Sequence, residues 1–537
     1  MPDAPLLVRR ILEHGSTVHA ASEVVTAVPD GMRRASYATV GANAARLAGA
    51  LHELGVSASD RVATFMWNNQ QHLEAYFAVP AMGAVVHPLN IRLSAGQVTY
   101  IANHAEDRVI IVDESLLPTL VPLLPELETV EHLIVNGSAG PLPATPATIT
   151  THRYADLIAR HPDRYPWPHV DELAAAALCY TSGTTGDPKG VSYSHRSIYL
   201  HALGTALPDS FGLSVGERVL AVVPQFHVLS WGLPYAALMT GADLLMPDRF
   251  LAPEALAGFI ALSGATKATA VPTVWQGLLR FVEAAPEIDI SSLREGIVGG
   301  ATCPPSLFHE YARRGVTLVH VWGMTEMSPI GTVARPPARA TADEAWRYRY
   351  SQGRFLCAVE ARLAGPDGDI LPHDGRSTGE LEVRGPWVTA GYFRADDATK
   401  FHDGWLRTGD VGFITEDGYL TITDRAKDVI KSGGEWISSV ELENHLMAHP
   451  AVQEAAVVAV PDERWGERPL AGVVLRDGAL VSFADLQAYL ADRIPRWQLP
   501  ERWTLLAEVP KTSVGKFDKK TLRARNEAGE LDVINLR

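Results

Sequence analysis

Short apolar runs alternate with amphipathic stretches through the first four hundred residues of the chain. Buried strands are predicted by the runs RVATFM, VIIVDE, HLIV, VLAVV, ATAV and GIVGG, most of which are rich in β-branched residues. Between the runs, apolar residues return with a helical period. Within residues 36–54, Val40, Ala44, Leu47 and Leu51 share one helical face. This alternation is typical of α/β layers built on largely parallel sheets.

The hydrophobic pattern changes after about residue 355. The segments EARLAGPDGDILP, GELEVRG and GYLTITD alternate with turn signals, PDG at 366–368 and EDG at 416–418. They predict antiparallel hairpins, and we expect residues from about 355 to 424 to form a small, barrel-like β-rich subdomain. The polar stretch 335–350 is interpreted as an irregular surface insertion.

A small α/β unit is predicted after Asp424. The segment SSVELENHLMAH reads as a helix capped by Ser438 or Ser439, and the strand AAVVAVP and the helix FADLQAYLADRI follow it. We therefore place a domain boundary at Asp424–Arg425. The expected fold is α/β: a large N-terminal domain of layered sheets over residues 1–424, and a small, mobile α+β domain over residues 425–537.

Composition narrows the class of protein. At 537 residues the chain is long enough for two to four domains with a large core, and 47% hydrophobic and 20% charged residues are ordinary for a globular protein. A formal net charge of −15 argues against a nucleic-acid binder, which needs a broad basic face. Positive charge for an anionic ligand must therefore be gathered locally.

The cysteines indicate a reducing compartment, and the lengths of the apolar runs bear on whether the chain is secreted or crosses a membrane. Cys179, Cys303 and Cys357 lie far apart and match no metal-ligand spacing, so neither a disulfide framework nor a zinc site is expected. The first residues carry Asp3 and no long apolar stretch, unlike a signal peptide. No run approaches 18 uncharged apolar residues, so we expect no transmembrane helix and a cytoplasmic protein.

One segment, YTSGTTGDPKG at 180–190, has the composition of a phosphate-binding loop. Its glycines let the backbone approach an anion closely, while its hydroxyls and lysine supply donors and charge. A Walker A loop is excluded by spacing, because Pro188 stands where the second glycine belongs. A plain flexible linker is the other interpretation, and the PKG ending disfavours it. The candidate phosphate ligands are Thr181, Ser182, Gly183, Thr184, Thr185, Gly186 and Lys189.

Further motifs follow the loop in a fixed order: VWGMTE at 321–326, RTGD at 407–410, KSGGEW at 431–436 and PKTSVGK at 510–516. With these motifs the chain resembles the adenylate-forming (AMP-binding) superfamily of acyl-CoA synthetases, adenylation domains and luciferases. The phrases SGGEWISSVELEN and FHVLSWGLPYA are similar to those of bacterial medium- and long-chain fatty-acyl-CoA ligases and of methylmercaptopropionate-CoA ligases.

The resemblance implies that ATP and Mg²⁺ activate a carboxylic acid as its acyl-adenylate. Lys516 is expected to bridge the carboxylate and the α-phosphate, and Glu326 with Thr181 to hold Mg²⁺. Asp410 is expected to accept hydrogen bonds from the ribose hydroxyls, with Arg425 nearby. The remaining residues implied at the nucleotide are Gly300, Ala301, Thr302, Val321, Trp322, Gly323, Met324, Thr325 and Lys431.

Trp322 departs from the family pattern. The family usually has Tyr or Phe at the position expected to stack on adenine. An indole can stack at least as well, and its larger size is expected to narrow the neighbouring acyl pocket.

The resemblance also implies an acyl pocket, a CoA site and a hinge. Rotation about Lys427 is expected to replace Lys516 by the 431–435 loop for the thiol step. His227 and Trp231 could instead be core-packing residues, and Gly433 and Gly434 could instead form a plain turn. The acyl-pocket candidates are His227, Val228, Trp231, Gly300 and Trp436, and the CoA candidates are Lys431, Gly433, Gly434, Glu435 and Trp436.

Basic residues gather at the end of the chain. Lys511 and Lys516 are followed by Lys519, Lys520, Arg523 and Arg525. Contact with the CoA phosphates and a solvated face are equally open interpretations for the last four.

The expected function is an ATP-dependent acyl-CoA ligase. No charged cluster lines the candidate pocket segments, which favours an apolar, fatty-acid-like substrate over an amino acid. The alternative is an enzyme that passes its acyl-adenylate to a carrier protein or a partner enzyme. A luciferase-like oxygenase shares the motifs, whereas a non-catalytic module would lack Lys516, Glu326 or the glycine loop. A homodimer is suggested by the resemblance alone.

Overall fold

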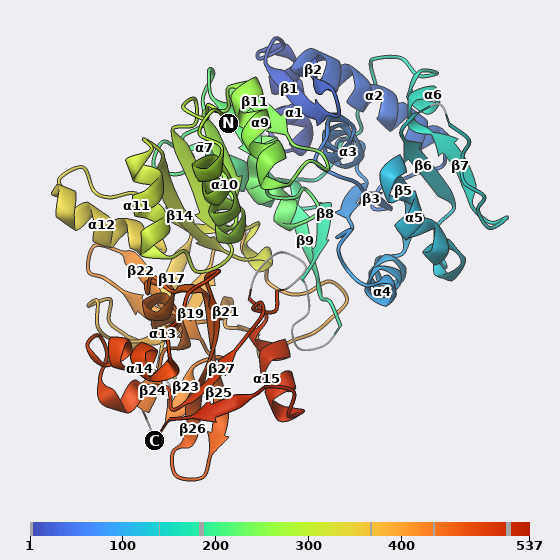
Figure 1. The fold of residues 1–537 in the computed structure, drawn as a ribbon. Helices are drawn as coiled ribbons and strands as arrows, with labels where there is room; N and C mark the ends of the chain where they lie inside the picture. The colour runs from blue at the N-terminus through green and yellow to red at the C-terminus, as the bar shows by residue number, and fades with distance from the viewer. Residues whose placement is uncertain are drawn as a thin grey trace.

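The computed structural model describes residues 4–138, 140–181, 187–365, 368–432, 435–511 and 517–536, with Glu435 and Trp436 described by their backbone alone. Within these residues the strands form three sheets, and the fold is mixed α/β as predicted. The seven-stranded sheet lies on one side of the fifteen-stranded sheet, and the C-terminal sheet lies at its far end, next to β17–β22 (Figure 1).

One half of the large sheet is mostly parallel and carries helices between its strands, as the alternating apolar runs predicted. Antiparallel β2 closes its edge beside β1. In spatial order the strands are β14 (Thr317–Gly323), β13 (Glu295–Gly299), β12 (Lys267–Ala270), β10 (Arg218–Ala221), β11 (Asp243–Met246), β1 (Glu23–Val28) and β2 (Gly31–Ser36). The associated helices are α8 (Leu233–Thr240), α9 (Pro253–Ser263), α10 (Pro272–Ala284) and α11 (Pro305–Arg313).

The other half is antiparallel, and its predicted hairpins are present. These strands continue the large sheet edge to edge through β15 and β16, so the β-rich part is hydrogen-bonded to the parallel half. The strands are β15 (Ile330–Val333), β16 (Gly353–Phe355), β22 (Tyr419–Arg425), β21 (Trp405–Ile414), β20 (Phe401–His402), β19 (Gly379–Arg384), β17 (Glu360–Ala364) and β18 (Ile370–Leu371).

The prediction of an irregular insertion at 335–350 was wrong in its second half. Helix α12 (Ala342–Tyr350) forms there. Thr341 and Glu344 make a reciprocal capping box at its start. Trp346 and Tyr350 pack against the apolar core beside His309 and Phe308 of α11. The capping box stabilises this helix although most of its residues are polar.

The seven-stranded sheet holds the start of the phosphate loop. Helix α3 lies in the apolar core on the face of this sheet that meets α1, α2 and α8. The strand order is β7 (Thr150–Arg153), β6 (His132–Asn136), β5 (Asp107–Asp113), β3 (Arg61–Phe65), β4 (Val85–Pro88), β8 (Ala175–Tyr180) and β9 (Gly190–Ser194). Its helices are α1 (Val8–Thr17), α2 (Tyr37–Glu53), α3 (Gln70–Ala81), α4 (Ala95–Ala105), α5 (Leu117–Leu120), α6 (Tyr154–Ile158) and α7 (His195–Ala206).

The C-terminal sheet has its own apolar clusters and joins β22 through the turn at 426–429, which contains Lys427. The predicted boundary at Asp424–Arg425 falls at the end of β22 and stays a prediction of where the chain divides. The strands are β24 (Glu435–Ile437), β23 (Ile430–Ser432), β26 (Gly466–Leu475), β25 (Val452–Asp462), β27 (Arg502–Leu505) and β28 (Val533–Asn535), with α13 (Ser439–Met447), α14 (Phe483–Ala491) and α15 (Lys519–Glu527).

In the described part of the chain, no helix combines the length and the apolar character that a membrane crossing requires.

Candidate functional site

The two ends of the predicted phosphate loop are joined by the hairpin of β8 and β9. The backbone N–H of Thr181 donates to the carbonyl of Lys189 at 2.9 Å, and the N–H of Lys189 donates to Thr181 Oγ1 at 3.3 Å. Ser182, Gly183, Thr184, Thr185 and Gly186 lie outside the described residues. The two described ends of the loop, Thr181 and Lys189, are therefore hydrogen-bonded to each other.

Lys189 pairs with Asp397, a residue that was not among the predicted site residues. Its Nζ donates to Asp397 Oδ2 at 2.6 Å and lies 4.9 Å from the ring centre of Tyr392. The hydrogen bond from Lys189 lowers the pKa of Asp397. The ammonium of Lys189 therefore lies between the carboxylate of Asp397 and the ring of Tyr392.

Glu326 is buried on the short 3₁₀ turn Thr325–Met327 that follows β14. Its Oε1 accepts a hydrogen bond from the Tyr392 hydroxyl at 2.7 Å, and its carbonyl accepts from the N–H of Thr389 at 2.8 Å. Tyr193 donates to the carbonyl of Thr325 at 2.6 Å. Burial and the nearby Glu326 charge raise the pKa of Tyr392, which keeps this phenol a donor.

Residues 389–397, here called the bridging segment, tie these groups together. Besides Tyr392 and Asp397, the N–H of Phe393 donates to the carbonyl of Gly190 at 2.7 Å. Arg394 pairs with both oxygens of Glu106 at 2.7 and 2.6 Å. Sequence analysis missed this segment because its partners are 66 and 208 residues away for Tyr392 and Asp397. Along the chain, only the Gly391–Tyr392 pair set this segment apart from its neighbours.

Three predicted nucleotide residues meet at Asp410. This buried carboxylate accepts from the indole N–H of Trp322 at 2.7 Å through Oδ2, and its Oδ1 pairs with Nε of Arg425 at 2.6 Å. The register of β21 and β22 sets Asp410 opposite Arg425. Carboxylate oxygens have two lone pairs each, so Asp410 keeps acceptor capacity for a ribose hydroxyl.

Trp322 and the turn at Gly300 lie at the carboxyl ends of neighbouring strands β14 and β13. Gly300, at φ +82°, begins the turn that contains Ala301 and Thr302. Trp231 lies next to this edge, because a Cβ added to Gly299 would lie 3.4 Å from its ring. The adjoining Cys303 is buried, which raises the pKa of its thiol, as expected for a structural cysteine.

The acyl-pocket candidates share an unusual turn. Val228, Leu229, Ser230 and Trp231 all have positive φ, from +43° to +55°. Non-glycine residues rarely adopt such angles, and a run of them persists only where the surroundings impose it. Val228 and Trp231 are buried, whereas the ring-bearing His227 precedes them at the partly exposed start of the turn.

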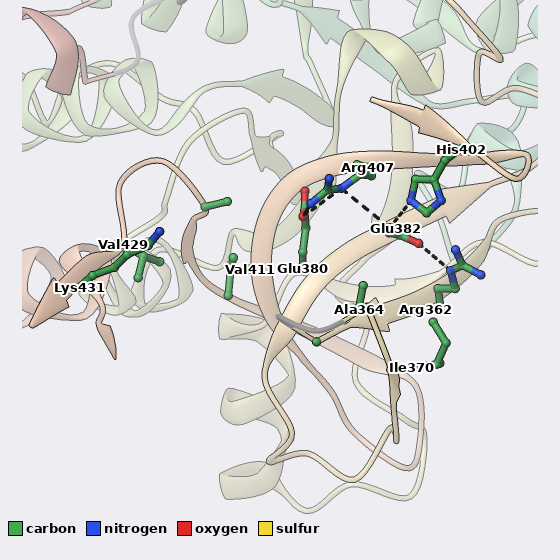
Figure 2. A pocket seen from close by; sticks show the side chains of 13 residues that line it. Arg362, Ala364, Ile370, Glu380, Glu382, His402, Arg407, Val411, Val429 and Lys431 are labelled. Atoms are coloured by element: carbon green, nitrogen blue, oxygen red, sulfur yellow. Dashed lines mark hydrogen bonds and ion pairs between the residues drawn. The ribbon is translucent and has the colours of Figure 1, made fainter. Parts of the chain in front are cut away.

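Lys431 lines a different space. A cavity of about 480 Å³ lies between β17, β19 and β21 on one side and Ala426, Val429 and Lys431 on the other (Figure 2). Val411 forms part of its wall. Because successive strand residues point to opposite faces, this cavity opens on the face of β21 away from the Asp410 side chain. In this arrangement Lys431 is apart from the Trp322–Asp410–Arg425 group.

Several candidates cannot be placed from the described residues. Gly433, Gly434 and Lys516 lie outside them, and the side chains of Glu435 and Trp436 are not described. Thr302, Val321, Gly323, Met324 and Thr325 lie on or beside the β13 and β14 ends already described.

The terminal basic residues divide into paired and exposed ones. Lys511 pairs with Glu454 at 2.8 Å and Arg523 with Asp428 at 2.8 Å, while Lys520 is exposed. Lys519 is not on a solvated face, because its ammonium is buried against Glu443 at 2.8 Å. The interpretation of Lys519 as a solvated residue was therefore wrong, and its contact with the CoA phosphates stays a prediction.

Comparison with known proteins gives a consistent match along the whole chain. The family model for AMP-binding enzymes matches residues 14–393, and that for the AMP-binding enzyme C-terminal domain matches residues 441–516. The chain is 44% identical to a medium-chain-fatty-acid–CoA ligase of Ectopseudomonas oleovorans, over 97% of this chain and 96% of the relative. It is 43% identical to a 3-methylmercaptopropionyl-CoA ligase of Ruegeria pomeroyi, over 97% of each.

Among solved structures, the crystal structure of the anthranilate CoA ligase AuaEII in complex with anthranoyl-AMP superposes with a TM-score of 0.87. It is 26% identical, and the match covers 98% of this chain and 99% of that chain.

Proposed function

Because this chain belongs to the AMP-binding enzyme family, we propose that it uses ATP to convert a carboxylic acid to its acyl-adenylate and then transfers the acyl group to CoA. The observation that supports this most is identity above 40% along nearly the entire chain to two CoA ligases. Transfer to a carrier protein, the alternative from the sequence, is not favoured by these relatives.

The proposed acid is largely apolar and fatty-acid-like. Both relatives act on acids with apolar or thioether chains, as their names state. Val228 and Trp231 are the candidate pocket walls, and both are buried apolar side chains. Trp231 lies beside Gly299, which precedes the Gly300 turn. Such a surface favours an alkyl chain by desolvating it.

In the proposed first step, a carboxylate oxygen attacks the α-phosphorus of ATP and pyrophosphate leaves. Two anions must meet, so fixed positive charge and N–H donors at the phosphates lower the barrier. Lys189, the glycine-rich loop and Lys516 are the proposed sources. Arg425 and Asp410 are proposed to hold the ribose, with Trp322 stacked on adenine.

Glu326, with Thr181, is the proposed holder of Mg²⁺. A buried carboxylate restrained by Tyr392 fits this ion, which binds one or two protein oxygens and takes further ligands from water and phosphates. When bound, Mg²⁺ would neutralise phosphate charge. Among the described residues no group of three or more His, Cys, Asp or Glu side chains gathers to form a protein-only metal site.

In the proposed second step, the thiol sulfur of CoA attacks the carbonyl carbon of the acyl-adenylate, loses its proton, and AMP leaves. Lys431, Gly433, Gly434, Glu435 and Trp436 are the proposed contacts of CoA, delivered by rotation about Lys427. We also propose a cytoplasmic location, which the three unpaired cysteines support. A homodimer is proposed from the resemblance alone.

The test is a panel of straight-chain acids assayed in parallel for ATP–pyrophosphate exchange and for acyl-CoA formation, with and without Mg²⁺. We expect both activities, strongest on apolar acids, and both lost on chelation. Exchange without thioester would favour the carrier-protein alternative, and neither activity on any acid would contradict the proposal.

Lys516→Ala separates the two half-reactions. We expect this variant to lose ATP–pyrophosphate exchange by about a thousandfold, because a charge at the transition state is removed, while thioester formation from pre-made acyl-AMP persists. Unchanged exchange would remove Lys516 from the mechanism. Lys520→Ala, at an exposed position nearby, is the matched control.

A further inference from the structure

A buried lysine lies near the junction between the C-terminal part and β22, the strand of the large sheet that comes last along the chain. Lys519 opens α15, and its side chain is only 11% exposed. Its Nζ lies 2.8 Å from Glu443 Oε1 and donates to Ser439 Oγ at 2.6 Å, and both partners lie on α13. An ammonium is rarely buried unless it is paired, so this position has a specific electrostatic role.

The same group reaches across to β22. Asp424 is 1% exposed, and its Oδ2 accepts hydrogen bonds from both the N–H and the Oγ of Ser439, each at 2.6 Å. Ser438 Oγ also donates to the carbonyl of Thr423. The start of α13 is therefore bonded directly to the C-terminal end of β22, a strand of the large sheet, across the 426–429 turn.

Two buried carboxylates depend on one cation. Burial raises the pKa of Asp424, and it raises the pKa of Glu443 to about 7, while the Lys519 charge opposes both shifts. Without Lys519, two buried carboxylates would remain without their shared cation. Removing one partner of a buried charge pair is strongly destabilising for that reason.

Apolar packing contributes little at this junction. In the described residues, the apolar clusters of the C-terminal sheet contain no residue of the large sheet. The cavity of about 480 Å³ separates Lys431 and Val429 from Val411 and Arg407 at the same junction (Figure 2). Among the described residues, the hydrogen bonds of Ser439 with Asp424 and of Ser438 with Thr423 connect the two parts at this junction. Lys519 holds Ser439 from the C-terminal side.

We propose that Asp424, Ser439, Glu443 and Lys519 form a latch that fixes the orientation of the C-terminal sheet on the large sheet, with Lys519 as its positioning residue. The consequence for catalysis rests on the proposed function. Lys516 precedes Lys519 by three residues, so its Cα can lie at most about 11 Å from that of Lys519. Holding Lys519 limits where Lys516 can act, and release of Asp424 permits another orientation.

Hydrogen exchange tests the latch without catalysis. The N–H groups of Asp428 and Val429 both donate to the carbonyl of Arg425, so exchange over 426–429 reports opening of the turn. In Lys519→Gln we expect exchange at 426–429 and at the start of α13 to be about tenfold faster or more. Lys519→Arg should restore part of the protection, and Lys520→Gln, at an exposed position, should match wild type.

Asp424→Asn is the second variant, because it weakens the contact to Ser439 but leaves the Lys519–Glu443 pair within the C-terminal part. We expect faster exchange at the same two places, with the core of β25 and β26 as protected as in wild type. The latch is overturned if Lys519→Gln and Asp424→Asn exchange like wild type at 426–429, or if the increase covers β25 and β26 equally.

The catalytic readout is the ratio of ATP–pyrophosphate exchange to thioester formation from pre-made acyl-AMP. Both latch variants should change this ratio by about fivefold or more, and Glu527→Gln, at an exposed position on α15, should leave it unchanged. An unchanged ratio in both latch variants overturns the catalytic role of Lys519. If wild type forms no acyl-adenylate, the proposed function fails, and hydrogen exchange still decides the latch.

Discussion

The indole N–H of Trp322 gives this residue a task that a phenylalanine could not perform. It donates to Asp410, the carboxylate that Arg425 also pairs with. In the proposed function, one side chain would therefore both stack on adenine and orient the carboxylate that accepts from the ribose. The departure from Tyr or Phe that the sequence revealed therefore has a hydrogen-bonding consequence as well as a steric one.

Trp322→Phe tests this at the scale of one residue. The ring area is largely kept, but the buried Asp410 loses a donor, and a hydrogen bond to a charged group contributes about 1.5–3 kcal/mol. We expect the Kd for AMP, measured by calorimetry, to rise about tenfold or more. Trp405→Phe is the control, because that ring on β21 lies against Arg362 and Arg384. Equal AMP affinity for Trp322→Phe and wild type would contradict the assignment.

At the scale of elements, the site depends on how closely β13 and β14 approach. Their carboxyl ends carry the Gly300 turn and Trp322, and Gly299 makes the close approach possible. An added Cβ there would lie 2.6 Å from the Val321 carbonyl oxygen, which is backbone and cannot move alone.

Gly299→Ala should therefore push the two strands apart and shift Trp322 and Trp231. Overpacking of this kind costs about 1–3 kcal/mol, and we expect lower thermal stability with at least about tenfold lower kcat/KM for the acid. Gly258→Ala is the matched control, since nothing lies within 4 Å of a Cβ in that part of α9. A helical Gly-to-Ala change there should be neutral or stabilising by up to about 1 kcal/mol. Equal thermal stability and equal kcat/KM for Gly299→Ala and Gly258→Ala would show that β13 and β14 do not pack tightly at Gly299.

At the scale of the whole molecule, buried neutral histidines make the fold sensitive to acid. Burial lowers the pKa of His201 to about 3 and of His72, His195 and His320 to about 4. These rings titrate near 6.5 once unfolded, so between about pH 4 and 6.5 the unfolded chain binds more protons. Stability from these groups is complete above that window and is lost as the pH falls through it.

His201→Gln tests the sign at one site. His201 Nε2 accepts from the N–H of Ile330 at 3.1 Å, which only the unprotonated ring can do. We expect this variant to reduce the pH dependence of the unfolding free energy between pH 4.5 and 6 by about 1.4 kcal/mol per pH unit, measured by denaturant titration. His373→Gln, at an exposed position, should keep the wild-type slope. Parallel slopes for wild type and His201→Gln would refute the assignment.

The local features of this protein were readable from its residues. Periodicity predicted the strands and helices, and the order of motifs identified the family and the ligase chemistry, all of which are confirmed. Glycine and hydroxyl spacing marked the 180–190 loop, whose phosphate-binding role stays a prediction. The site residues were chosen in the same way, and the structure gathers Trp322, Asp410 and Arg425 as neighbours. The capping box of Thr341 and Glu344 was also a local signal, and it indicated helix α12 where an irregular insertion was predicted.

Tertiary structure decided which distant groups meet. Asp397 reaches Lys189 across 208 residues, Tyr392 reaches Glu326 across 66, and Lys519 reaches Ser439 across 80. Periodicity and turn signals arise from neighbours along the chain, whereas these pairs depend on sheet order and on the path of the bridging segment. The same lysine at 519 would be solvated on an isolated helix, and it is buried here because its ammonium lies against Glu443 and Ser439 of α13.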